Sequence, residues 1–74
     1  MINAKDYEVN KDVLKFVEEI ARGMNLYPVY LNHQDLLNIS CVVGMHILYN
    51  HFIKDKIDFT RGYILAYNKY VKEV

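Results

Sequence analysis

Histidine and cysteine are among the residues of this 74-residue chain whose side chains could bind a metal ion or act as a nucleophile. Two histidines on one helix share a metal when they stand three or four residues apart, because both rings then lie on one face. His46 and His51 are five residues apart, and His33 lies too far along the same predicted helix to complete a site. The sequence therefore predicts no metal site and no cofactor.

Cys41 is expected to be chemically inert. A catalytic thiol needs a neighbouring base and a positively charged environment, which keep it ionised. Cys41 instead follows Ile39 and Ser40 and precedes Val42 and Val43, a pattern typical of a buried position. Ser40 stands in no nucleophile motif. We therefore expect a protein that is not an enzyme.

The composition argues against several classes of protein. Nine basic and nine acidic residues give a net charge of zero, whereas a nucleic-acid-binding domain usually carries a basic excess. One cysteine cannot form an internal disulfide, and the sequence has neither a secretory signal pattern nor an apolar run of about 18 residues. The sequence therefore predicts a cytoplasmic protein that does not cross a membrane and does not favour nucleic acid.

The spacing of the apolar residues predicts one compact all-α domain over residues 1–74, with three helices at about 10–22, 33–54 and 59–73. In the first of these helices, Asn10 is the expected N-cap and Gly23 the expected left-handed residue after the last turn. Glu18 and Arg22 have the spacing and order of a helical ion pair. The apolar residues of this helix repeat at helical spacing and form one face: Val13, Leu14, Val17, Ile20 and Ala21.

The second predicted helix begins with Asn32 and Asp35, whose spacing resembles a capping box. Its apolar residues surround the helix instead of forming one stripe, which is typical of a buried helix. Two neighbouring helices cannot cover every side. The apolar connector at 26–31 could cover part of this helix, and we expect a protein partner or a second copy of the chain to cover the rest. The spacing of Ser40 and Gly44 would allow another helix to approach closely.

The third predicted helix begins at Asp58, with Thr60 as the second choice of N-cap. Leu65 and Lys72 fall on its polar side, where burial does not account for Leu65. The opposite face carries a stripe of three tyrosines: Tyr63, Tyr67 and Tyr70. Such a stripe is as typical of a helical core as of a protein interface.

The codon bias implied by the composition indicates a source for the gene. Isoleucine, asparagine, lysine and tyrosine occur seven times each, while glycine, alanine, arginine and proline together occur nine times. The first group has AT-rich codons, which indicates a low-GC bacterium or one of its phages or mobile elements. We therefore expect an accessory or inhibitor protein of such an element, acting in the host cytoplasm.

The expected function is that of a small non-catalytic module that binds a host protein or a second copy of itself. The expected contact residues lie on the outer face of the second helix and on the third helix: Met45, His46, Tyr49, Ile53, Leu65, Tyr67 and Lys69. Two alternatives remain open. Three helices of this length also suit a homodimeric helix-turn-helix-like DNA-binding regulator, although the third helix offers few cations. The chain could equally be a structural subunit of a larger assembly.

Overall fold

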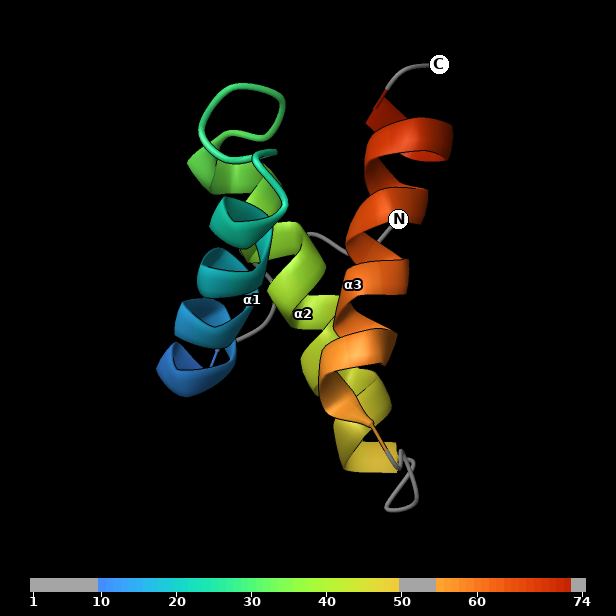
Figure 1. Cartoon of the computed structure of the whole chain (residues 1–74). Helices are drawn as coiled ribbons and strands as arrows, with labels where there is room; N and C mark the ends of the chain where they lie inside the picture. Colours follow the sequence, from blue (N-terminus) through green and yellow to red (C-terminus); the bar gives the residue numbers. More distant parts are fainter. Residues whose placement is uncertain (1–9, 50–54, 73–74) are drawn as a thin grey trace.

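The computed structural model describes residues 10–49 and 55–72. Its elements follow in the order α1 (Lys11–Gly23), α2 (His33–Tyr49) and α3 (Lys56–Ala66), and α3 continues directly into a π-helical segment, η2 (Tyr67–Lys72). The predicted all-α, three-helix architecture is confirmed (Figure 1). Residues 50–54 of the second predicted helix lie outside the described residues.

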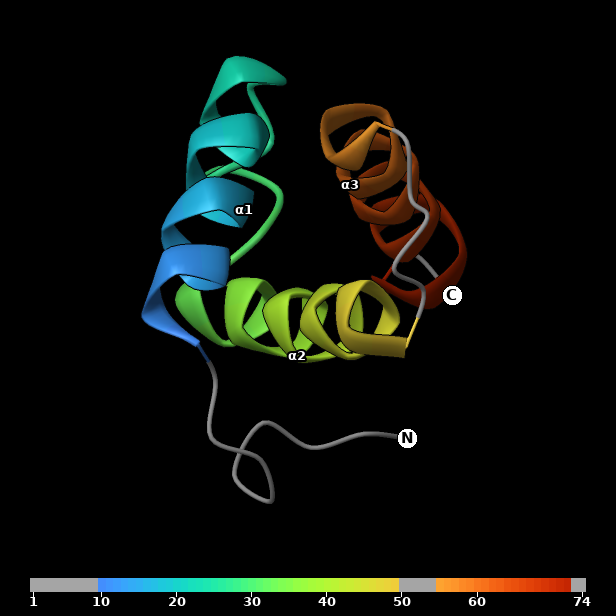
Figure 2. The same ribbon diagram turned by 90° about the horizontal axis from the view of Figure 1, so that it is seen from below.

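The three helices pack against one another in every pairing, α1 with α2, α1 with α3, and α2 with α3. Figure 2 shows α1 and α3 on the same side of α2. The Cα radius of gyration is 11.4 Å, close to the roughly 11 Å expected for a folded domain of this size. The shared core takes residues from each helix and from the connector between α1 and α2: Val17, Ala21, Leu31, Leu36, Ile39, Val43 and Ile64.

The first helix follows the prediction at its start and differs at its end. The side chain of Asn10 accepts hydrogen bonds from the backbone N–H groups of Asp12 and Val13, at 2.8 and 3.3 Å, as expected of an N-cap. Gly23 is not left-handed but lies within the helix, and Asn25 takes the positive φ of 60° instead. The helix runs one residue further than predicted, and asparagine is one of the few residues that tolerate the left-handed region.

The N-terminus of α2 is the predicted capping box. The backbone N–H of Asp35 donates to Asn32 Oδ1 at 2.8 Å, and the N–H of Asn32 donates back to Asp35 Oδ2 at 2.8 Å. Beyond this cap the helix is enclosed, since between Asp35 and Ile47 every residue except His46 is buried or half-buried. The side of α2 that was expected to need a partner is thus largely covered by its own chain over this range.

Gly44 is the point at which α1 approaches α2. A Cβ atom at this position would lie 3.9 Å from Val13 Cγ1. The small residue that was expected to admit a second chain therefore faces a helix of the same chain. Self-association through α2 stays a prediction, and the described residues of α2 give it no exposed apolar patch.

The start of α3 lies earlier than predicted. Asp55 is the N-cap, and its Oδ1 accepts from the N–H groups of Ile57 and Asp58 at 3.1 and 3.2 Å. Asp58 then lies in the first turn, where a carboxylate is favoured by the positive end of the helix dipole. Thr60 is no cap but a fully buried residue inside the helix. The buried face of α3 is consequently centred on Thr60 and Ile64, with the tyrosines beside it.

Two titratable groups in this interior have raised pKa values. Burial raises the pKa of the Cys41 thiol above its usual 9.0, in agreement with an inert buried cysteine. Burial, and secondarily the neighbouring Tyr67, raises the pKa of Tyr63 above its usual 10.0. In both cases the folded chain favours the neutral form, because a charged group loses its hydration on burial.

The free energy of unfolding is therefore expected to fall in alkaline solution. Below pH 9 both groups are neutral in either state, and above pH 9 to 10 the unfolded chain ionises first and becomes favoured. Urea unfolding followed by circular dichroism at several pH values measures this fall. Tyr63→Phe should reduce it. A free energy of unfolding that stays constant up to pH 11, or an identical fall in Tyr63→Phe, would contradict the prediction.

Candidate protein-binding surface

Most of the exposed large apolar side chains lie on one continuous segment. Six such residues are exposed among those described, and four of them belong to α3 and η2, namely Ile57, Leu65, Tyr70 and Val71, with exposed fractions of 45–66%. The other two, Val29 and Tyr30, lie in the connector between α1 and α2. A helical segment that packs one side on the core and exposes apolar residues elsewhere is a candidate for a contact surface.

A groove of about 530 Å³ lies between α1 and α3. Its α1 wall carries Phe16, Ile20 and the C-cap residue Met24, and its α3 wall carries Ile57, Arg61 and Leu65. Both sets have four-residue spacing, so each wall is a ridge along its helix. Glu19 and Gly23 complete the lining. We refer to this feature as the α1–α3 groove.

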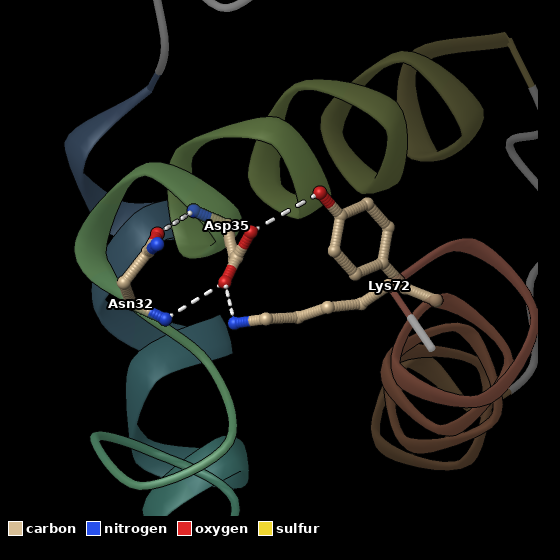
Figure 3. A network of polar contacts seen from close by, with 4 residues as sticks. Asn32, Asp35 and Lys72 are labelled. Carbon is tan, nitrogen blue, oxygen red and sulfur yellow. Dashed lines mark hydrogen bonds and ion pairs between the residues drawn. The ribbon is translucent and has the colours of Figure 1, made fainter. Parts of the chain in front are cut away.

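Asp35 fixes the position of η2 against α2 (Figure 3). Besides the N–H of Asn32, its carboxylate accepts a hydrogen bond from the hydroxyl of Tyr67 at 3.3 Å and forms an ion pair with the ammonium of Lys72. Asp35 is only 9% exposed, so these donors replace the water that its carboxylate has lost. We refer to Asn32, Asp35, Tyr67 and Lys72 as the Asp35 cluster.

The π-helical winding of η2 explains why Lys72 belongs to this cluster. Lys72 was predicted on the polar side of the third helix, and that placement is wrong. A π-helix bonds each residue to the one five positions away, so Tyr67 and Lys72 come to lie on one face. The same winding leaves Tyr70, which was predicted on the apolar face, 66% exposed.

The predicted contact residues therefore fall into three groups. Leu65 and Lys69 are exposed on α3 and η2, as a contact role requires, and Tyr67 is half-buried and bound to Asp35. On α2, Met45 is half-buried and His46 is exposed. The centroids of the His46 and Phe59 rings lie 5.6 Å apart. The side chain of Tyr49 and the whole of Ile53 lie outside the described residues.

Sequence reasoning missed Ile57, Tyr70 and Val71 as exposed residues. Ile57 precedes the predicted start of the third helix, and its exposure on α3 follows from the cap at Asp55. Tyr70 and Val71 are exposed because of the π-helical winding. No local pattern in the sequence predicts that winding, because the contacts that accompany it come from Asp35, more than thirty residues away.

The described residues contain no group of three or more histidine, cysteine, aspartate or glutamate side chains placed to hold a metal ion. The described helices also include none with the length and apolar character needed to cross a membrane. Comparison with protein-family models, with curated proteins and with solved structures finds no match to this chain.

Proposed function

We propose that this chain is a non-catalytic protein-binding module that contacts its partner with the outward side of α3 and η2. The contact residues are Leu65, Lys69, Tyr70 and Val71, which we call the C-terminal patch. The observation that carries the proposal is the exposure of three large apolar side chains within seven residues of one helical segment. Water disfavours such exposure, and a protein partner would relieve it.

Tyr70 is of a residue type that binds proteins well. Tyrosine is enriched at interface hot spots, where its aromatic ring fills a pocket and its hydroxyl finds a hydrogen bond. The ammonium of Lys69 lies 5.4 Å from the centre of the Tyr70 ring. The Asp35 cluster holds the turn that carries these side chains, which lowers the entropy lost on binding.

The partner proposed is a host protein, and the module is an accessory or inhibitor protein of a low-GC phage or mobile element. The AT-rich coding bias supports this source. DNA binding is the alternative, and the charge distribution favours it less. Lys72 is paired with Asp35, which leaves Lys56, Arg61 and Lys69 as the exposed basic residues of α3 and η2 that have no ion pair within the described structure. Phosphate binding normally needs a larger basic surface.

Affinity capture with the tagged chain from the native host, followed by mass spectrometry, tests the proposed function. We expect one stoichiometric host protein with the wild-type chain. Tyr70→Ala should weaken its binding at least about tenfold, because truncated hot-spot residues lose roughly 2 kcal/mol or more. Tyr30→Ala is the matched control, since Tyr30 is also an exposed tyrosine, at 57%, but lies in the connector.

Each other outcome contradicts the proposal. DNA recovered without protein would favour the helix-turn-helix-like regulator, and recovery of virion components would favour a structural subunit. Equal capture by Tyr70→Ala and the wild type, with circular dichroism showing both folded, would exclude the C-terminal patch as the contact surface.

A further inference from the structure

We infer that the α1–α3 groove is the interface of a homodimer, in which α3 of each copy lies in the groove of the other. The two copies are related by a two-fold axis, and the two α3 helices cross each other at its centre. This inference goes beyond the proposed function, because it concerns a different surface and a different occupant. Leu65 alone belongs to both surfaces.

The charges of the groove are self-complementary. Glu19 stands on the α1 side and Arg61 on the α3 side, and both residues are exposed. Among the described residues, the ion pairs are Glu18 with Arg22 and Asp35 with Lys72, so neither groove charge is paired with another described residue. A two-fold axis brings Glu19 of each copy to Arg61 of the other, which forms two identical ion pairs. The net charge of zero also means that the two copies do not repel each other.

Gly62 supplies an independent observation. Gly62 lies in the middle turns of α3 and is exposed to solvent. Its φ is not positive, and an added Cβ would meet no atom within 4 Å. The fold of the single chain therefore does not require glycine here, and glycine costs about 1 kcal/mol relative to alanine at such a position. Ala66, one turn further on, is also exposed. Two small residues one turn apart allow the backbone of another helix to approach closely.

The shape of the two walls fits a second copy. A groove between helical ridges receives a ridge of the same kind, because rows of residues four apart interdigitate. Ile57, Arg61 and Leu65 form such a row on α3, and the exposed fractions of Ile57 and Leu65 are 45% and 54%. The same row of a second copy would cover these side chains together with Phe16 and Ile20 of the opposite wall.

Charge reversal of the two groove residues tests the dimer, with sedimentation equilibrium as the measurement. The wild-type chain should sediment as a dimer at micromolar concentration. Glu19→Arg places two positive groove charges on each copy and Arg61→Glu places two negative ones, so each variant alone should dimerise at least about tenfold more weakly. An equimolar mixture of the two variants should form a heterodimer. The double variant Glu19→Arg with Arg61→Glu should recover the wild-type dimer.

Three further variants separate the interface from general effects of charge and folding and from the C-terminal patch. Lys15→Glu changes the net charge as much as Arg61→Glu does, but Lys15 does not line the groove, so this variant should dimerise as the wild type does. Gly62→Ala should raise the helical stability of the monomer and weaken the dimer, two changes of opposite sign. Tyr70→Ala should leave the dimer intact, which keeps this test separate from that of the C-terminal patch.

A wild-type chain that is monomeric at 100 µM or above would overturn the inference. So would a Glu19→Arg variant that dimerises with the wild-type constant, or a mixture of the two charge variants that stays monomeric. Dimers that survive both charge reversals but dissociate on substitution of Met45 would instead assign the interface to α2.

Discussion

Ile64→Ala is expected to remove a large part of the stability of this domain. Ile64 is fully buried at the centre of the α3 face and belongs to the core formed with α1 and α2. Truncation of a buried isoleucine to alanine costs about 2–5 kcal/mol, through lost burial and the cavity that remains. A domain of this length has a total stability of about 4–11 kcal/mol, so this loss is a large share of it, and at the lower end of that range the variant would be unfolded.

Leu65 provides the matched control for this prediction. It is the next residue in the same helix, has the same number of carbon atoms as Ile64, and is 54% exposed. The loss in the free energy of unfolding caused by Leu65→Ala should be at most about a third of the loss caused by Ile64→Ala. Chemical unfolding at low protein concentration, where a dimer would be dissociated, compares the two variants. Equal losses would mean that a different face of α3 packs against the core.

Asp35→Ala is the second substitution with a large expected effect. It removes the acceptor of the Asn32 N–H and at the same time leaves Tyr67 and Lys72 without their acceptor. Asn32 still caps the helix in this variant, and loss of the reciprocal bond from its N–H costs about 1 kcal/mol. Loss of a largely buried acceptor for a charged and a neutral donor costs about 1–3 kcal/mol more. We expect a total loss of about 2–4 kcal/mol, measured by urea unfolding.

A control and a double-mutant cycle test whether the cluster is the cause. Asp58→Ala removes an exposed carboxylate from the first turn of α3 and should cost less than about 1 kcal/mol. Lys72→Met should cost less than Asp35→Ala, because it removes one donor to the Asp35 carboxylate and keeps those from Asn32 and Tyr67. The two substitutions combined should then be less damaging than the sum of their separate effects. Strict additivity would show that Asp35 and Lys72 do not interact in solution.

The parts of the fold that the sequence predicts are those decided by neighbouring residues. The cap at Asn10 and the reciprocal bonds of Asn32 and Asp35 involve side chains within three residues of the groups they bind. The apolar face of α1 is likewise a local pattern, and its members Val17 and Ala21 are fully buried as expected.

The predictions that are wrong are those decided by distant packing or by competition between similar residues. Asp55 and Asp58 are both suitable N-caps, and the sequence alone gives no reason to prefer the earlier one. The placement of Lys72 fails because the prediction assumed α-helical rotation throughout, whereas η2 winds more widely beside Asp35. For the candidate surface, Leu65 and Lys69 were predicted correctly as exposed residues. Tyr67, which was predicted as a contact residue, is half-buried, and Tyr70 is exposed in its place.

The Asp35 cluster also has a consequence for the order in which the chain folds. The bonds between Asn32 and Asp35 span three residues and can form as soon as α2 does, whereas those from Tyr67 and Lys72 close loops of 32 and 37 residues. Closing such loops costs chain entropy before any contact is gained, which places these bonds late in folding. We therefore expect the turn that carries Tyr70 and Val71 to dock last and to open first, at a free energy well below that of global unfolding. Amide hydrogen exchange in η2 would then be faster than in α2, and a bound partner would slow it.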